Sequence, residues 1–388
     1  MKTSTDRILT THVGSLPRSA AVTDLVFRRE AGEPLNFAEF SATVSAAVRE
    51  VVRRQAEAGI DVVSDGEMSK ISYATYIKDR LTGFDGDSER NPPQDLEDYP
   101  NYLRKIASSG GTPTYRRPRC VGPITVKSMQ PLMDDIAWFR NALQHATVVE
   151  PFMNAASPGV IALFQPNEYY PSHQGYLEAL AEAMRPEYES IVAAGFMLQI
   201  DSPDLGLGGH TIFKGRPRDE YVRLAHLHVE ALNHALRNCP ADRVRMHICW
   251  GNYEGPHHHD IPMDIVLPIA LRGKPQGLQF EASNPRHAHE WVVFRDAINS
   301  GRLPEDKILI PGVIDSVTNF IEHPLLVAER IERFANLVGR QRVIAGTDCG
   351  FSTFAGFGAV DADIVYAKLA SLAQGAQFAS ERLWKAAK

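Results

Sequence analysis

The stretch that decides the fold is TVSAAVREVVRRQAEAGIDVVSDG, residues 43–66. Its first part predicts an amphipathic helix over Thr43–Ala58, because valines recur there at helical spacing, at positions 44, 48, 51 and 52. Gly59 is suited to end that helix, since glycine adopts the left-handed conformation common at helix ends without strain. Asp61–Asp65 follows at once as a short β-rich run and predicts a strand.

The same alternation of helix and strand recurs along the chain. Pro324–Val338 has apolar residues at helical spacing, a proline suited to the first turn, and Gly339 beyond its end. Eight β-rich runs are found: Ile8–Ser15, Asp61–Asp65, Arg119–Ile124, Phe196–Asp201, Val244–Cys249, Leu278–Ala282, Ile308–Ile314 and Val343–Cys349. We therefore predict the α/β class and a TIM (β/α)8 barrel, in which eight parallel strands alternate with helices.

Two connections are longer than is usual between neighbouring elements of such a fold. Residues 85–118 are polar and rich in Pro and Gly, which predicts a loop excursion, or lid, between the second and third strands. Residues 125–195 are apolar enough to fold, and we predict a long helical crossover there between the third and fourth strands, ending in the helix Tyr176–Ala194. Because no linker or internal repeat is found, we predict one domain over residues 1–388.

The composition excludes several classes of protein. The 388 residues are 44% hydrophobic and 23% charged, and the net charge of −6 disfavours a general nucleic-acid binder. Four scattered cysteines are too few for a disulfide framework, which favours a reducing compartment. The densest apolar stretch, Ile265–Leu271, is too short to cross a bilayer. We expect a cytoplasmic protein with small-molecule partners, and the sequence leaves its oligomeric state open, a homo-oligomer included.

Metal-binding side chains stand at the carboxyl ends of three predicted strands, the end at which a TIM barrel carries its functional groups. His247 and Cys249 are two residues apart and so face the same side of one strand. Glu281 ends the next strand, and Cys349 ends the last. One imidazole, two thiolates and one carboxylate suit zinc. Cysteine is also a common core residue, so these residues by themselves leave a metal site and ordinary packing about equally open.

Eight motifs occur in a fixed order: TTHVGSLPR (10–18), DGEMSK (65–70), VGPIT (121–125), QIDSPD (199–204), HICWGN (247–252), FEASNPRH (280–287), PGVID (311–315) and GTDCGF (346–351). In order and placement they resemble the catalytic barrel of the cobalamin-independent methionine synthase superfamily. The chain resembles a short form, without the additional amino-terminal half of the full-length enzymes. The resemblance implies that His247, Cys249, Glu281 and Cys349 bind Zn²⁺.

In that family, zinc binds the substrate thiol as a thiolate and so keeps the sulfur nucleophilic at neutral pH. The resemblance therefore implies zinc-dependent transfer of an alkyl group, expected to be methyl, to a thiol such as homocysteine. The implied activity is like that of 5-methyltetrahydropteroyltriglutamate–homocysteine methyltransferase. Our hypothesis is that Glu281 is the ligand that loosens when the substrate sulfur arrives.

The family's binding groups for the amino-acid thiol also have counterparts in this chain. The resemblance implies that Ser15, Glu67 and Asp201 hold this substrate, because two carboxylates suit an ammonium group. Arg18 is suited to an anionic head group by bidentate contact. Without the resemblance, Glu67 would be interpreted as a solvated loop charge and Asp201 as a capping residue.

Three positions depart from the family pattern and concern the folate donor. Met129 aligns with a tryptophan that stacks on the pterin, Val317 replaces a histidine that serves as proton donor, and Ser202 replaces an acidic residue. These changes put methyltetrahydrofolate in doubt and leave thiol activation intact. Asp315, His12 and a water molecule remain as alternatives for proton delivery.

Other readings of the sequence stay open. The chain also resembles the shorter branch that contains epoxyalkane:coenzyme M transferase, in which a zinc-bound thiolate opens an epoxide, as in 2-hydroxypropyl-coenzyme M lyase. Alternatives of another class are a zinc-free barrel like uroporphyrinogen decarboxylase and a non-catalytic zinc- or thiol-binding protein.

The tract His257–Asp260 has the composition of a metal cluster. Consecutive residues on a loop seldom converge on one ion, so we interpret it as the rim of the substrate entrance. Four residues just past Glu281 are predicted to surround the metal ligands or to begin a helix: Asn284, His287, His289 and Trp291.

Overall fold

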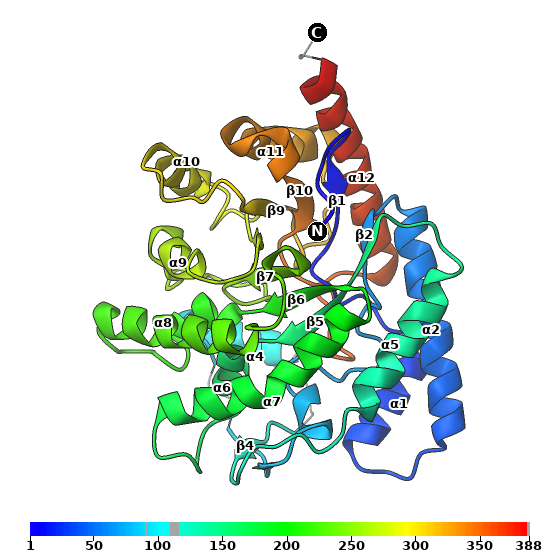
Figure 1. Cartoon of the computed structure of the whole chain (residues 1–388), viewed down its shortest axis with the longest axis vertical. Coiled ribbons are helices and arrows are strands. Elements are labelled where there is room, and N and C mark those ends of the chain that lie inside the picture. The colour runs from blue at the N-terminus through cyan, green and yellow to red at the C-terminus, as the bar shows by residue number, and fades with distance from the viewer. Residues whose placement is uncertain (90–91, 109–115, 386–388) are drawn as a thin grey trace.

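Eight parallel strands form the centre of the computed structural model, which describes residues 1–89, 92–108 and 116–385 (Figure 1). The strands are β1 (Leu9–Thr10), β2 (Val62–Val63), β5 (Glu150–Ala156), β6 (Met197–Asp201), β7 (Val244–Ile248), β8 (Gly277–Phe280), β9 (Ile308–Ile314) and β10 (Ile344–Thr347). Their order in the sheet is β1-β10-β9-β8-β7-β6-β5-β2. A parallel bridge between Thr11 and Val62 joins the first strand to the last. The predicted TIM barrel is confirmed.

The helices lie around this ring of strands (Figure 1). They are α1 (Ala20–Glu30), α2 (Phe37–Glu57), α5 (Gln130–Leu143), α6 (Pro158–Phe164), α7 (His173–Ala193), α8 (Arg218–Ala235), α9 (Met263–Ala270), α10 (Trp291–Asn299), α11 (Pro324–Val338) and α12 (Ala362–Lys385). Short 3₁₀ turns are η1 (Tyr76–Asp79), η2 (Pro203–Leu205), η3 (Leu207–His210), η4 (Ala241–Arg243) and η5 (Arg340–Arg342). No helix of the described residues is both long and apolar enough to cross a membrane.

The two helices predicted in most detail are both found. Helix α2 buries the four predicted valines and begins earlier than predicted, because Asn36 caps the backbone N–H groups of Ala38 and Glu39. Helix α11 has the predicted bounds, and Gly339 beyond it has a φ of 88°, a conformation that favours glycine.

The predicted third strand is wrong. Arg119–Cys120 forms β4, which pairs antiparallel with β3 (Phe84–Asp85) outside the barrel. The third barrel strand is β5, which pairs with β2 and β6. Its sequence, EPFMNAA, contains a proline, an asparagine and two alanines, all poor strand formers, so it carried little β signal. Directly after β5, Ser157 is the N-cap of α6.

The excursion between β2 and β5 is therefore longer than predicted. Beside β3 and β4 it contains helices α3 (Gln94–Glu97) and α4 (Pro100–Ser108). Parts of the predicted 85–118 lid, residues 90–91 and 109–115, lie outside the described residues. The assignment of the whole chain to a single domain stays a prediction.

The inside of the barrel changes from apolar at the amino-terminal ends of the strands to polar at their carboxyl ends. Two small apolar clusters contact Met1 at the lower end: Leu9, Ile308, Ile310 and Ile344, and Val62, Phe152 and Met197. Above them Arg245 donates to Thr11 Oγ1 and to the His12 carbonyl, and its guanidinium lies 3.7 Å from the ring centre of Phe152. Such a polar upper layer places hydrogen-bonding groups directly beneath the mouth of the barrel.

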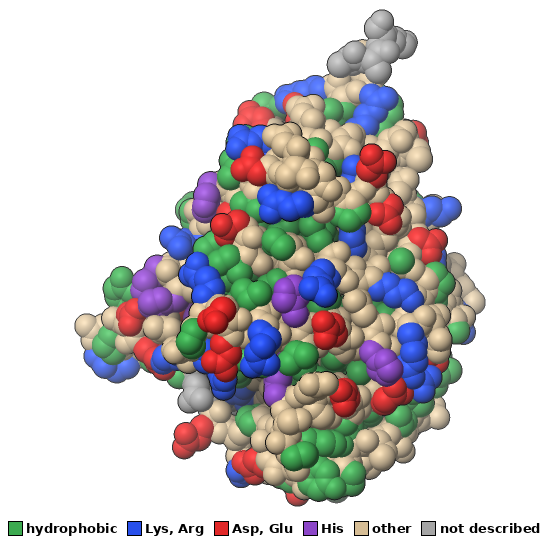
Figure 2. Space-filling model, turned by 60° about the vertical axis from the view of Figure 1, so that its left-hand side comes forward, with side chains coloured by type: hydrophobic (Ala, Val, Ile, Leu, Met, Phe, Trp, Pro, Cys, Tyr) green, Lys and Arg blue, Asp and Glu red, His purple; other side chains and the backbone are tan. Residues whose placement is uncertain are grey.

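On the face shown in Figure 2, acidic and basic side chains lie intermixed over the surface. Neither sign of charge dominates this face.

A buried ion pair joins the excursion to the barrel helices. The guanidinium of Arg80, next to η1, pairs with the carboxylate of Glu187 on α7, and their side chains are 1% and 2% exposed. The Arg80 carbonyl accepts from the backbone N–H groups of Lys127 and Ser128, ahead of α5. Loss of one partner would leave an uncompensated charge in the interior.

We predict that Arg80→Ala lowers the free energy of unfolding by about 3–5 kcal/mol, the usual cost of breaking a buried ion pair from one side. Urea unfolding followed by circular dichroism measures this change. Arg53→Ala, which removes the exposed pairs with Glu50 and Glu57, is the control and should leave the unfolding midpoint unchanged. Equal effects of the two variants would contradict this account of Arg80.

Candidate active site and metal centre

Three predicted metal ligands meet at the mouth of the barrel. Donor atoms of His247, Cys249 and Cys349 all lie within 4.8 Å of one another, and all three residues are buried. Cys349 Sγ lies 3.7 Å from Nε2 of His247. The parallel pairing of β7 with β8 and of β10 with β9 brings these strand ends to one rim.

Glu281 stands beside this trio and is held by hydrogen bonds. Its Oε1 lies 3.8 Å from Cys349 Sγ and accepts from the backbone N–H of Trp250 at 2.9 Å. Its Oε2 accepts from Nδ2 of Asn284 at 2.6 Å. Asn284 is thus placed as the sequence predicted, next to a metal-ligand candidate.

Asp348 positions the same segment, a role that the sequence analysis missed. Its carboxylate accepts from the backbone N–H groups of Ala282, Ser283 and Asn284. The backbone of Asp348 passes so close to Gly312 that a Cβ at Gly312 would lie 2.6 Å from the Cα of Asp348. The motif position between Thr347 and Cys349 was the available signal for this residue.

Burial and neighbouring groups shift the pKa values of His247 and Cys349. Burial lowers the pKa of His247 to about 3, which keeps its imidazole neutral, as a metal ligand must be. A hydrogen bond with Cys249, burial, and the nearby carboxylates raise the pKa of Cys349 well above its usual range. Acidic groups crowded in a dry site in this way favour occupation by a cation.

The trio lies in the wall of a cavity of about 490 Å³. Ser15, Glu67 and Asp201 line the same cavity. The structure therefore brings together three of the four predicted substrate-binding residues with the metal-ligand candidates. Much of the remaining wall is apolar, formed by Tyr73, Leu96, Leu103, Phe164, Leu207, Phe354 and Phe357.

Glu67 is held in an uncommon conformation with its carboxylate towards this cavity. Its φ is 58°, which is unusual for a residue other than glycine and is found more often at functional sites. Its side chain is buried, and Oε2 has no hydrogen-bond partner among the described residues. Burial and the nearby Asp201 raise the pKa of Glu67 to about 7, although Lys70 opposes this shift.

Asp201 is held by two amides. Asn154 Nδ2 donates to its Oδ2 at 2.8 Å, and Gln199 Nε2 donates to its Oδ1 at 2.9 Å. Burial raises the pKa of Asp201 to about 6. Asn154 could not be predicted from the sequence, because it belongs to strand β5, whose residues carry little β signal.

Arg18 and His12 do not line the cavity. Arg18 donates through Nε and Nη2 to the carbonyl of Glu67 and through Nη1 to the carbonyl and hydroxyl of Ser352. His12 is fully buried, its Nε2 lies 2.6 Å from Oε1 of Gln55, and its Nδ1 accepts from the N–H of Gly14. Burial lowers the pKa of His12 to about 3. These contacts hold the loop after β1 in place.

Asp315 lines an adjoining cavity of about 270 Å³, together with Glu281, Asn284, Ser316 and Cys349. Its Oδ1 accepts from the backbone N–H groups of Val317 and Thr318. Cys349 therefore lines both cavities.

The tract at 257–260 is divided between the interior and the rim. His257 lies 3.1 Å from Oδ2 of Asp260, whereas His258 and His259 turn outward to Asp98. His287 stacks on Trp250 and lies between Asp260 and Glu290, which together raise its pKa to about 10. Trp291 lies instead beside the guanidinium groups of Arg295 and Arg333, and His289 is exposed.

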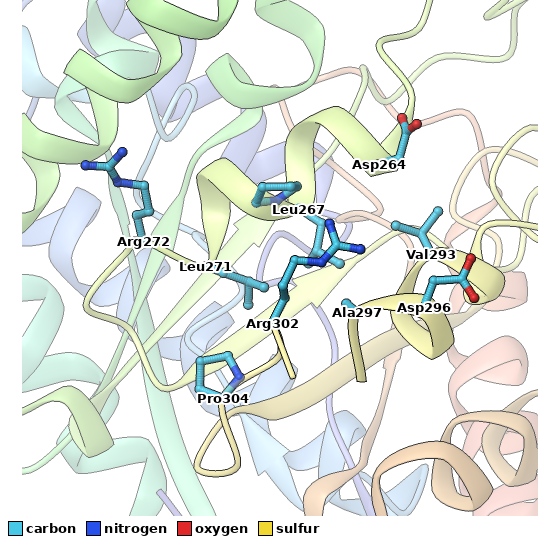
Figure 3. A pocket seen from close by; sticks show the side chains of 10 residues that line it. Asp264, Leu267, Leu271, Arg272, Val293, Asp296, Ala297, Arg302 and Pro304 are labelled. Atoms are coloured by element: carbon cyan, nitrogen blue, oxygen red, sulfur yellow. The ribbon is translucent and has the colours of Figure 1, made fainter. Parts of the chain in front are cut away.

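A further surface cavity of about 410 Å³ lies between α9 and α10 (Figure 3). Its floor is apolar, with Leu267 and Val293, and Asp264 and Arg302 extend around it. It contains none of the predicted site residues, so we place the candidate site at the barrel mouth.

The chain matches the family model described as "Cobalamin-independent synthase, Catalytic domain" over residues 8–91. It is 26% identical to the methionine synthase of Saccharolobus solfataricus over 377 residues, which span 96% of this chain and 95% of that protein. The predicted resemblance to the cobalamin-independent methionine synthase superfamily is confirmed. The methionine synthase of Sulfolobus acidocaldarius is 24% identical over 379 residues, covering 97% and 93% of the two chains.

Solved structures of methionine synthases share the fold. The B12-independent methionine synthase from Shewanella sp. W3-18-1, determined in complex with selenomethionine, superposes with a TM-score of 0.73 at 19% identity. That match covers 98% of this chain and 99% of the other. A putative vitamin-B12-independent methionine synthase from Listeria monocytogenes gives a TM-score of 0.65, also at 19% identity, covering 96% and 98%.

The contacts of Arg18 predict a positioning role. Arg18→Ala should lower the free energy of unfolding by about 1–3 kcal/mol, because it leaves the carbonyls of Glu67 and Ser352 without their donor. Denaturant unfolding, with Arg53→Ala as control, measures this effect. A variant of full stability that loses affinity only for thiols with an acidic head group would instead support the direct binding role that the resemblance implied.

Proposed function

We propose that the chain is a zinc-dependent methyltransferase that transfers an alkyl group, most simply methyl, to the thiol of an amino acid such as homocysteine. The relatives are methionine synthases, which indicates methyl transfer in general terms. The observation that carries the specific proposal is the shared cavity: a His/Cys/Cys trio and two buried carboxylates line the same space.

The residues at the trio fit a zinc ion. His247, Cys249 and Cys349 supply nitrogen and sulfur donors, and Glu281 supplies a carboxylate beside them. The Nδ1 atom of His247 is buried and has no hydrogen-bond partner among the described residues. When bound there, zinc would hold the substrate sulfur as a thiolate at neutral pH. Trp250 and Asn284 hold the carboxylate of Glu281 beside the trio.

Glu67 and Asp201 would bind the ammonium group of the substrate. Their carboxylates are close enough for Asp201 to raise the pKa of Glu67, and a positive charge between them would relieve this repulsion. The unpartnered Oε2 of Glu67 is available to accept from an ammonium N–H. Ser15, whose hydroxyl approaches Gly350 next to Cys349, lies on the same wall.

Asp315 is our proposed group for proton exchange with the leaving atom of the donor. It lines the adjoining cavity that also reaches Cys349. His12 is unsuited to this role, because it is buried between Gln55 and Gly14.

The apolar wall favours a second candidate reaction, the addition of a thiol to an epoxide. Among the described residues lining the larger cavity, the charged side chains are Glu67 and Asp201, so the lining offers no cation for the acidic tail of a folate. Met129 and Val317 replace family residues that serve the folate donor. Assays of one thiol with a methyl donor and with a simple epoxide separate the two reactions.

The metal site is tested by Cys349→Ser. We expect this variant to lose stoichiometric zinc and thiol alkylation while keeping the fold, because it removes a ligand that connects His247 and Glu281. Elemental analysis measures zinc, and X-ray absorption at the zinc edge with and without homocysteine or coenzyme M shows whether the substrate sulfur joins the shell. Cys239→Ser, a substitution of a buried cysteine outside the trio, should keep both properties. Full zinc content and activity in Cys349→Ser would refute the site.

The ammonium site is tested by Asp201→Asn. This variant should raise the KM for homocysteine about tenfold or more, since a hydrogen bond to a charged group contributes about 1.5–3 kcal/mol. Mercaptobutanoate, which is homocysteine without its amino group, is the matched substrate and should be affected much less. Equal losses with both thiols would remove the proposed role.

The raised pKa values predict a pH dependence of the same contact. As the pH falls, Glu67 takes up a proton through about 7 and Asp201 through about 6, and each then loses its attraction for ammonium. The ratio of the KM for homocysteine to that for mercaptobutanoate should therefore rise on acidification. The ratio cancels any pH dependence of thiolate formation that both substrates share, and a constant ratio would contradict the assignment.

A further inference from the structure

Two surface histidines and one aspartate converge at the rim, outside the site described above. Asp98, immediately after α3, accepts on its Oδ2 from Nε2 of His258 at 2.9 Å and from Nε2 of His259 at 2.6 Å. One donor atom from each of the three side chains lies within 4.8 Å of the others. Among the described residues, the trio at the barrel mouth is the other group with this property.

We propose that Asp98, His258 and His259 form a second metal site, for a divalent transition-metal ion such as Zn²⁺, Co²⁺ or Ni²⁺. Two imidazoles and a carboxylate are the donors that such ions accept, and the absence of sulfur distinguishes the site from the buried trio. The side chains are 46%, 34% and 32% exposed, so water can complete the coordination shell.

The three ligands come from two segments far apart in sequence. Although His258 and His259 are consecutive, their rings pack with centroids 4.2 Å apart, and both Nε2 atoms reach the same carboxylate oxygen. The third ligand comes from the excursion between β2 and β5. The sequence predicted residues 257–260 only as the rim of the substrate entrance and gave no sign of Asp98 as their partner.

The proposed site lies where two segments that line the larger cavity meet. The excursion contributes Leu96 and Leu103 to the wall of the larger cavity, and the loop after β7 contributes Tyr253. The two segments already meet beneath the rim, where buried Asp95 accepts from the Tyr253 hydroxyl and the His257 N–H. Tyr102 also donates to the carbonyl of Glu254. A metal ion bound to Asp98, His258 and His259 would join the same two segments at the outer edge and stabilise the cover of the cavity.

The test uses the whole chain with both cysteines of the buried trio replaced, Cys249→Ser with Cys349→Ser, so that its result does not depend on the proposed function. Cobalt is added at a pH above the ordinary histidine pKa of about 6.5. We expect one equivalent to bind with weak visible d–d absorption and without a thiolate-to-cobalt charge-transfer band.

In the double-serine chain, cobalt binding should be abolished by the pair His258→Ala and His259→Ala, and also by the single substitution Asp98→Asn. The matched control is His234→Ala, since His234 is an exposed histidine that also contacts a carboxylate, on Glu182, but has no second imidazole beside it. The control should keep the full equivalent.

Limited proteolysis of the excursion provides a second readout. Zinc should slow cleavage between residues 92 and 108 in the double-serine chain and have no effect once His258 and His259 are removed. The proposal is overturned if the double-serine chain binds no cobalt, if His234→Ala removes binding as fully as the rim variants, or if cleavage is unaffected by zinc.

Discussion

The parallel register of the barrel strands is the constraint on which the site depends. Asp201 on β6 is paired with His247 on β7, and Ile248 is paired with Phe280 on β8, so Cys249 and Glu281 follow side by side. A shift of one residue in either pair would turn every inward side chain of that strand outward. Closure of the ring then brings Cys349, after β10, across to His247.

Several acidic groups are buried at this rim. Glu67, Asp201, Glu281 and Cys349 all have raised pKa values, and burial is the largest cause for the three carboxylates. Burying such groups costs free energy unless a cation compensates them. We therefore propose that the acid-rich mouth binds two positively charged groups, a metal ion at the thiols and an ammonium group at the carboxylates.

Several polar side chains hold these groups in place. Arg18 fixes the carbonyl of strained Glu67, Asn154 and Gln199 fix Asp201, and Asp348 fixes the segment that follows Glu281. Each is itself a buried or partly buried polar side chain whose hydrogen bonds replace those of water. Above them the excursion supplies an apolar cover, and its junction with the loop after β7 is where we place the second metal site.

The sequence by itself determined the barrel and seven of its eight strands, and it placed four candidate metal ligands at strand ends, which the family resemblance assigned to Zn²⁺. It could do so because helical spacing, buried β-rich runs and the residues at strand ends are local patterns. It could not identify β5, whose proline, asparagine and alanines give a weak strand signal, and so it missed Asn154. Only the tertiary structure separated Glu67 and Asp201, which face the cavity, from Arg18 and His12, which brace the loop beneath. Only it joined Asp98 to His258 and His259, since the direction of a side chain and its distant partners are set by packing and not by neighbouring sequence.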